Sequence, residues 1–280
     1  MRYLEVQPKP ALSRFVECFW TLEDEGVAGP IRPERILPDG CVELILNFGA
    51  HFSQHKEKGE AVRQPLRYVV GQMTRPILVA PTGRVQLMGI RFHPGGTLPF
   101  FRLPMNEVTD RVVELAGLDG NLDRNLVAAA GDGPLLSQRI AAVEDWLIKR
   151  ARDCKHDSWL VGLASTIISR QGQLSVDRMA KDAGVSGRQL ERRFLREVGI
   201  GPKLFCRILR FQQVFRAFEQ TDAGWAAVAA DCGYYDQAHL IRDFQQFAGQ
   251  TPSVLLTLTT ALTESFTRKN RTSHFSNTPA

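Results

Sequence analysis

The segment 186–196, SGRQLERRFLR, gathers side chains that can form hydrogen bonds and ion pairs with nucleic acid. Leu190 and Phe194 are four residues apart, which places them on one face of a helix and directs them inward. The side chains left for solvent or a partner are Arg188, Gln189, Glu191, Arg192, Arg193 and Arg196. Guanidinium groups bind phosphates and the edge of guanine, and side-chain amides bind the edge of adenine. The segment therefore predicts a DNA-binding helix, with Ser186 as its N-cap.

The segment 236–246 repeats this pattern later in the chain. Leu240 and Phe244 lie 50 residues after their counterparts in the first segment, and Asp236 takes the N-cap position. The polar side chains that would face a partner are Gln237, His239 and Arg242. A repeat of this length indicates one structural unit that is written twice.

A short helical pattern ends in a glycine ahead of each segment, Gly184 in the first copy and Gly233 in the second. These glycines are 49 residues apart, so the second copy has one extra residue just after its glycine. Two short helices joined by a tight glycine turn predict a helix-turn-helix unit. The apolar helix 203–218 would hold the two units at a fixed separation, so that their second helices enter successive major grooves about 34 Å apart.

Charge is distributed unequally between the two copies. Residues 186–216 contain eight Lys or Arg and two Glu, whereas residues 217–254 contain one Arg and five Asp or Glu. Attraction to phosphate therefore comes from the first copy. The second copy is expected to contribute base contacts or shape complementarity.

Over about 100 residues, 157–258, the chain resembles the AraC/XylS family of bacterial transcription regulators. The residues that carry the resemblance are Ala180, Gly184, Ser186, Leu190, Phe194, Gly199, Pro202, Leu209, Arg210, Phe211, Ala229, Gly233, Tyr234, His239, Leu240, Phe244, Gly249, Thr251 and Pro252. The resemblance implies a regulator that binds double-stranded DNA in the bacterial cytoplasm, in association with the nucleoid, and that has RNA polymerase as a partner. Whether it activates or represses stays open.

The resemblance also assigns positions. It implies base contacts from Arg188, Glu191 and Arg192 in the first unit, and from Gln237, His239 and Arg242 in the second. It places phosphate contacts at the N-terminal turns of both recognition helices. The chain departs from the family where Gly187 replaces a common proline and where the segment after Pro252 lacks the usual aromatic residue and arginine.

Residues 1–105 have the pattern of short strands separated by turns. The apolar runs 41–48, 68–70, 77–80 and 85–92 alternate with Gly, Pro and Thr, and the polar segment 51–64 suggests an exposed loop. This spacing predicts a small β-barrel or β-sandwich, and the resemblance implies a cupin-like barrel that binds an effector. The segments RPERILPDGCVELILNFG and GIRFHPGG resemble the sensor-type domain of an uncharacterised branch of the family.

Trp20, Glu43 and Arg91 are the candidates for an effector pocket in this half of the chain. The alternative for each is plain packing or an internal salt bridge. The ligand would be an unknown small molecule, and an effector that favours one arrangement of the domains would change DNA affinity.

The fold expected overall is a multidomain α+β chain. It has a β-rich effector-binding domain at 1–105, a helical linker at 106–155, an all-α DNA-binding domain at 157–258 and a disordered tail at 259–280. The linker carries Leu136, Ile140, Val143, Trp146 and Leu147 at helical spacing, so it serves either as a dimerisation helix of a homodimer or as a packed connection.

Composition and cysteine spacing bear on whether the chain is a disulfide-bonded, metal-binding or membrane protein. The chain has 280 residues, a net charge of +5 and five scattered cysteines, which favours reduced thiols over disulfides or a zinc site. No metal site is expected from His51, His55 and His93, no cofactor is indicated, and no apolar run is long enough to span a membrane.

Two other functions stay open from the sequence. One is a DNA-binding protein whose N-terminal half only dimerises. The other is an enzyme fused to a DNA-binding tail, which would need a reactive cysteine, and Cys18 and Cys41 lie in apolar runs without a neighbouring histidine.

Overall fold

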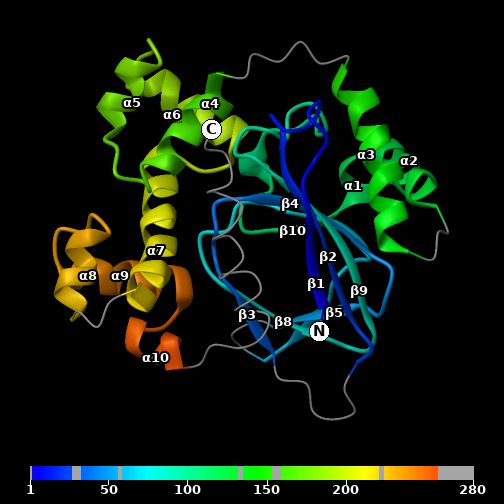
Figure 1. Ribbon diagram of the computed structural model, residues 1–280, viewed down its shortest axis with the longest axis horizontal. Helices are drawn as coiled ribbons and strands as arrows, with labels where there is room; N and C mark the ends of the chain where they lie inside the picture. The colour runs from blue at the N-terminus through cyan, green and yellow to red at the C-terminus, as the bar shows by residue number, and fades with distance from the viewer. Residues whose placement is uncertain are drawn as a thin grey trace.

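The computed structural model describes residues 2–26, 33–55, 59–131, 135–152, 159–220 and 224–257. Two parts of the chain lie side by side: a sheet-rich N-terminal domain and a helical C-terminal domain (Figure 1). The sheets occupy the middle of the molecule, with helices α1–α3 on one side and the C-terminal helices on the other (Figure 1). The predicted domain boundary near residue 155 and the predicted tail 259–280 lie outside the described residues.

The first sheet has six antiparallel strands. In spatial order they are β1 (Arg2–Val6), β2 (Val16–Asp24), β9 (Val85–Phe92), β4 (Val42–Asn47), β7 (Arg67–Val70) and β10 (Val112–Glu114). The second sheet has four antiparallel strands. Their order is β3 (Glu34–Ile36), β8 (Ile77–Pro81), β5 (Phe52–His55) and β6 (Ala61–Arg63).

The sequence predicted a cupin-like barrel, and the strand order shows two open sheets instead. Both sheets are open, because β1 and β10 end the first sheet and β3 and β6 end the second without pairing to each other. A barrel requires every strand edge to be paired. The segment 51–64, expected as an exposed loop, also contains β5 and β6, and its Phe52 side chain is buried between the sheets.

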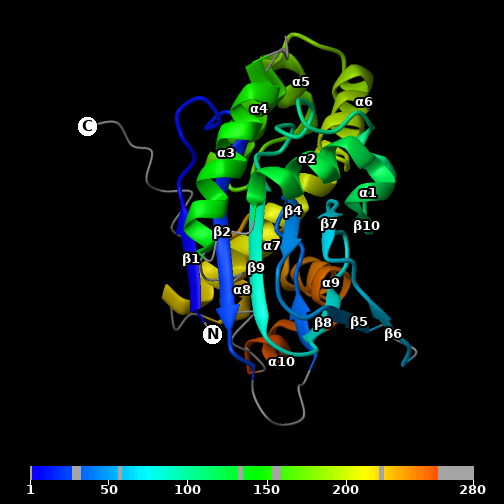
Figure 2. The same cartoon turned by 90° about the vertical axis from the view of Figure 1, so that its right-hand side faces the viewer.

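Side chains of the central strands alternate between two cores, as the period of two in a strand requires. Met88, Ile90 and Phe92 of β9 face the core that lies under the helices. Leu87 of the same strand faces the opposite core between the two sheets, together with Trp20 of β2. The second core contains the cavity described below. Figure 2 shows β1, β2, β9, β4 and β7 of the six-stranded sheet side by side in this order.

Helices cover the outer face of the six-stranded sheet. They are η1 (Met105–Glu107), α1 (Leu115–Leu118), α2 (Gly120–Ala130) and α3 (Leu136–Arg152). The predicted apolar stripe of α3 is present: Leu136, Ile140, Val143 and Leu147 are buried in the core shared with the sheet, and Trp146 is half-buried at its edge. This stripe therefore holds α3 to its own domain and is not available to a second copy of the chain.

Seven helices make up the described part of the C-terminal domain. They are α4 (Trp159–Ser169), α5 (Val176–Asp182), α6 (Gly187–Glu197), α7 (Pro202–Gln220), α8 (Trp225–Asp231), α9 (Gln237–Ala248) and α10 (Pro252–Thr257). The long helix α7 stands between the pair α5–α6 and the pair α8–α9 (Figure 1). Phe211 of α7 contacts Phe244 and Phe247 of α9, with ring centroids 4.8 and 5.4 Å apart, so α7 fixes the second pair. No helix in the described ranges is long and apolar enough to cross a membrane.

Candidate DNA-binding surface and effector cavity

The two predicted helix-turn-helix units have the same turn. Gly184 and Gly233 adopt φ values of +65° and +73°, a region that glycine enters without steric cost. The residue after each glycine donates its backbone N–H to the helix before it: Val185 to the carbonyl of Ala180 at 3.0 Å, and Tyr234 to that of Ala229 at 2.9 Å. These hydrogen bonds end α5 and α8 alike, which confirms the repeat at the level of the backbone.

Tyr235 is the extra residue of the second copy. Because Val185 and Tyr234 occupy equivalent positions, and Ser186 and Asp236 are both N-caps, Tyr235 has no counterpart in the first unit. Its side chain is 94% exposed. An aromatic ring at the start of a recognition helix can stack on sugars and bases or donate its hydroxyl to phosphate. The one-residue offset of the repeat was the sequence signal for it, although the sequence pattern alone assigned that residue only to the turn.

A capping box closes the N-terminus of α6. Ser186 Oγ accepts the backbone N–H of Gln189 at 3.2 Å, and Gln189 Oε1 accepts the backbone N–H of Ser186 at 2.9 Å. This cap compensates for Gly187, the departure from the family's proline. The predicted DNA contacts Ser186 and Gln189 therefore stabilise the helix start, although both remain at the surface.

Arg188, Arg192 and Arg196 form an exposed stripe on α6. Their spacing of four residues places them along one face of the helix. The described residues offer these three side chains no carboxylate within ion-pair distance, so their charge is available to an anion. Arg192 and Arg196 also line an open groove with Trp159 of α4.

Two other predicted contacts of α6 are engaged within the chain. Arg193 forms an ion pair with Glu197 at 2.7 Å, and Glu197 is buried. The carboxylate of Glu191 lies against the α6–α7 turn, where a Cβ placed on Gly201 would be only 2.3 Å from Oε1. Glu191 is exposed, but in this conformation its carboxylate is directed to that turn.

Helix α9 presents a smaller polar surface. Asp236 caps it by accepting the backbone N–H of His239 at 2.7 Å. Gln237 and Arg242 are exposed, whereas the His239 ring is half-buried and packs edge-on against Tyr234 at 5.2 Å. Gln237 and Arg242 are thus the predicted residues of this helix with free access to a duplex.

The excess of positive charge predicted for the first copy is smaller at the surface than in the sequence. Arg207 of α7 forms an ion pair with the buried Asp243 of α9 at 2.6 Å, and Arg210 donates to the carbonyl of Gly172 at 3.0 Å. Both guanidinium groups join elements of the domain. The charge that can attract phosphate is concentrated on α6.

A cavity of about 80 Å³ lies between the two sheets. It is several times larger than the roughly 10–15 Å³ that one water molecule needs. Its apolar wall is formed by Trp20, Leu22, Ile36, Leu37, Ile45, Phe52, Tyr68, Val70, Met73, Ile77, Val79 and Leu87. Its polar part consists of Arg35, Asp39, Cys41, Glu43, Gln64 and Gln212. An apolar pocket with a few convergent polar groups is the usual form of a small-molecule site.

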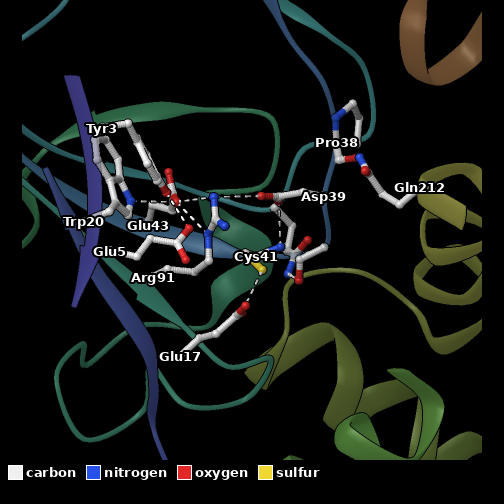
Figure 3. A network of polar contacts seen from close by, with 12 residues as sticks. Tyr3, Glu5, Glu17, Trp20, Pro38, Asp39, Cys41, Glu43, Arg91 and Gln212 are labelled. Atoms are coloured by element: carbon white, nitrogen blue, oxygen red, sulfur yellow. Dashed lines mark hydrogen bonds and ion pairs between the residues drawn. The ribbon is translucent and has the colours of Figure 1, made fainter. Parts of the chain in front are cut away.

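Trp20, Glu43 and Arg91 lie close together (Figure 3), and Trp20 and Glu43 line this cavity. Strand register causes the meeting, because Glu43 of β4 pairs directly with Arg91 of β9, and Trp20 of β2 pairs with Gly89. Glu43 Oε1 accepts from Trp20 Nε1 at 3.0 Å and from Arg91 Nε at 2.9 Å. Trp20 and Glu43 line the cavity, whereas Arg91 lies behind them and is 1% exposed. Glu43 and Arg91 thus form an internal salt bridge, and Trp20 and Glu43 form part of the cavity wall.

Asp39 completes this polar cluster and was missed as a site residue. Its Oδ2 lies 3.4 Å from Arg91 Nη2, and its Oδ1 accepts the backbone N–H of Cys41 at 3.0 Å. In the sequence it lies between Pro38 and Gly40, and nothing in that pattern marked it as a site residue. Burial raises the pKa of Glu43, and the Arg91 guanidinium opposes that rise.

The loop 37–41 connects the cavity to the DNA-binding domain. Pro38 offers its carbonyl to Gln212 Nε2 of α7, and Gly40 packs on the Phe205 ring of α7 so closely that an added Cβ would lie 3.0 Å from it. On the neighbouring strand β3, Arg35 donates to the carbonyl of Ala248 at the C-terminal end of α9. The same short segment therefore lines the cavity and contacts the helices that position both units.

Cys18 and Cys41, two thiols of the N-terminal domain, are both buried. Burial raises the pKa values of Cys18 and Cys41, which makes both thiols poor nucleophiles. The structure, within its described ranges, has no group of three or more His, Cys, Asp or Glu side chains placed to hold a metal ion. The state of the two thiols does not favour an enzyme that uses a reactive cysteine.

Comparison with known families assigns the two domains. Residues 4–114 match a family described as a domain of unknown function (DUF6597), and residues 179–257 match a family described as a helix-turn-helix domain. The C-terminal part of the chain is an AraC-type helix-turn-helix domain, as the sequence predicted. A chain that carries this domain is a DNA-binding transcription regulator.

Solved structures with a similar arrangement have low sequence identity. ToxT from Vibrio cholerae is 8% identical with a TM-score of 0.46, and the match covers 87% of this chain and 99% of that one. ToxT with a bound unsaturated fatty acid is 8% identical with a TM-score of 0.42, covering 86% and 96%. The AraC-like transcriptional activator CuxR is 9% identical with a TM-score of 0.28, covering 75% and 79%. No curated protein matches the chain.

Proposed function

We propose that this chain is a sequence-specific transcription regulator whose DNA affinity is controlled by a small molecule bound between the two sheets. The observation that supports this most directly is the shared loop 37–41, which lines the cavity and also contacts α7. The AraC-type domain supports the DNA-binding part of the proposal.

Helix α6 makes most of the DNA contacts in this proposal. Its exposed stripe allows Arg188 and Arg192 to reach guanine edges, while Arg196 contacts phosphate. Helix α9 reads the next major groove through Gln237 and Arg242, and Tyr235 contacts the backbone or stacks at the groove edge. Arg193 is left out of this set because it holds Glu197.

Control by an effector follows from the difference between two states of the loop. A ligand that contacts Asp39 or Glu43 changes the position of the loop relative to Arg91. Since Pro38 and Gly40 contact α7, the change alters the packing of the DNA-binding domain. The coupling is reciprocal, so DNA binding must change ligand affinity by the same factor.

RNA polymerase is the further partner that this proposal includes, because a regulator of this domain type acts through transcription. A homodimer is also part of the proposal, but its contact surface would have to differ from the buried stripe of α3. The proposal places the protein in the bacterial cytoplasm, where DNA and polymerase are found.

Two measurements test the proposal. Fluorescence anisotropy with selected DNA should show affinity that falls steeply with salt, whereas a flat response would remove the phosphate contacts. A thermal-shift screen of the full chain against bacterial metabolites should give a compound that stabilises the wild type. Ile77→Trp, which fills the cavity from β8, should abolish that stabilisation. If every stabilising compound acts equally on Ile77→Trp, the cavity is not the effector site.

A further inference from the structure

We infer that the cavity binds a small molecule with an apolar body and one protonated nitrogen, and that this cation sits beside Glu43 and Asp39. The inference rests on the proposed function, since it names the chemical class of the effector. It follows from the wall of the cavity, the arrangement of donors around Glu43 and the charge of the polar end.

The body of the ligand is defined by the wall. Most of the lining is aliphatic or aromatic and comes from both sheets, with Trp20 and Tyr68 from one and Phe52 and Ile77 from the other. Trp20 is held flat against the sheet because Gly89 lies under its ring, where an added Cβ would be 2.0 Å from the indole. Such a wall favours a compact apolar group, and the volume of about 80 Å³ limits its size.

Glu43 determines which polar group of the ligand can bind. The contacts that the structure gives this carboxylate converge on Oε1: it accepts from Trp20 Nε1 at 3.0 Å and from Arg91 Nε at 2.9 Å, and it lies within ion-pair distance of Arg91 Nη2 at 2.8 Å. Its other oxygen, Oε2, receives no donor from the described residues. Because Glu43 lines the cavity, this oxygen is an acceptor that a ligand can use.

The carboxylates in the polar part of the cavity favour a ligand with a positively charged donor. Glu43 and Asp39 both line the cavity, and Glu17 lies close by, with Oε2 3.7 Å from Cys41 Sγ. The guanidinium that faces these carboxylates, Arg91, is covered by them and does not line the cavity. Arg35 lines the cavity but donates to the Ala248 carbonyl. A carboxylate ligand would meet two like charges here, whereas an ammonium group would meet two opposite charges.

Binding of such a cation also acts on the loop. The contact between Arg91 Nη2 and Asp39 Oδ2 is 3.4 Å, longer than the 2.8 Å contact to Glu43, so it is the weaker of the two. An ammonium group beside Asp39 competes with Arg91 for this carboxylate. Asp39 lies between Pro38 and Gly40, the two residues that contact α7.

Three probes of similar shape and different charge test the inference: benzylamine, benzyl alcohol and benzoate. Each is titrated into the full-length protein, with binding followed by thermal shift and by isothermal calorimetry. Benzylamine should bind saturably and more tightly than the other two. Glu43→Gln should weaken benzylamine binding by about tenfold or more, because a charged hydrogen bond is replaced by a neutral one. The matched control Glu107→Gln changes an exposed glutamate outside the cavity and should have no effect.

Additional variants keep the test decisive. Circular dichroism establishes whether Glu43→Gln is folded, and if it is not, Asp39→Asn takes its place with the same expected loss. Ile77→Trp should remove binding of every probe. Tighter binding of benzoate, equal binding of benzyl alcohol, or no binding of benzylamine would each overturn the inference.

Anisotropy with DNA on the same samples separates this inference from the proposed function. If benzylamine fails to bind but the protein still binds DNA in a sequence-specific manner, the effector class is wrong and the regulator remains. If benzylamine binds but DNA does not, the cavity chemistry stands and the proposed function fails.

Discussion

Arg193 Nη1 lies 2.7 Å from Glu197 Oε1, and the Glu197 side chain is 2% exposed. The two residues are one helical turn apart on α6, and the Arg193 guanidinium also lies 5.3 Å from the centre of the Trp159 ring of α4. An arginine that neutralises a buried carboxylate contributes to folding. The neighbouring arginines of α6, at positions 188, 192 and 196, are free to contribute to binding.

Arg193→Ala is therefore expected to lower the free energy of unfolding by about 1–3 kcal/mol, because Glu197 loses this partner while buried. Arg192→Ala, the adjacent exposed arginine, should change stability by less than about 0.5 kcal/mol. Urea denaturation followed by circular dichroism measures both. Equal stabilities of the two variants would contradict a structural role for Arg193.

DNA affinity, unlike stability, should depend on the exposed arginines of α6. Arg192→Ala is expected to weaken specific binding by about 1–3 kcal/mol if it contacts a base edge, and Arg196→Ala to lower the salt slope by about one unit if it contacts phosphate. Anisotropy titrations at several salt concentrations distinguish the two effects. Arg178→Ala, on α5 and paired with Asp182, provides the control and should leave affinity unchanged.

Tyr235 and Tyr234 are adjacent but should respond differently to truncation. Tyr235→Ala removes a ring that is 94% exposed, so DNA affinity should fall while stability is maintained. Tyr234→Ala removes a buried ring and should cost about 3–5 kcal/mol of stability. The measurement is a pair of melting curves and DNA titrations. Unchanged affinity of Tyr235→Ala would remove this residue from the interface.

The buried cluster of the cavity gives a further prediction. Arg91→Met leaves the Asp39 and Glu43 carboxylates without their shared partner, so the free energy of unfolding should fall by about 3–5 kcal/mol. Arg84→Met, at an exposed position beside Glu25, should be close to neutral. Chemical denaturation of the two variants compares them directly, and a stable Arg91→Met protein would show that the cluster does not depend on this charge.

Much of the C-terminal domain could be predicted from the sequence, because its signals are local. Caps, glycine turns and pairs of apolar residues four apart are read within a few positions, and the repeat supplies each signal twice. Ser186, Asp236 and Gly184 occupy the predicted positions. The partners of Arg193 and Arg207 could not be predicted in the same way, since the sequence does not show which arginine meets a buried carboxylate.

The fold of the N-terminal domain was harder to predict from the sequence because it depends on strand register. The runs of β4 and β9 were found, but the pairing of Glu43 with Arg91 comes from long-range contacts between strands. The closed barrel was wrong for the same reason, since local alternation does not determine whether the edge strands meet. Trp20, Glu43 and Arg91 were nevertheless the candidates for the effector pocket, and the structure brings them together.

In the proposed function, α6 and α9 read DNA sequence as one rigid pair. Selection of bound duplexes from a random library by the full-length protein, repeated with Arg192→Ala, tests it most directly. We expect an enriched motif with two blocks separated by about one helical turn, roughly 10–10.5 base pairs, and loss or relaxation of one block in Arg192→Ala. Enrichment of no motif, or of the same motif with the same affinity by both proteins, would contradict it.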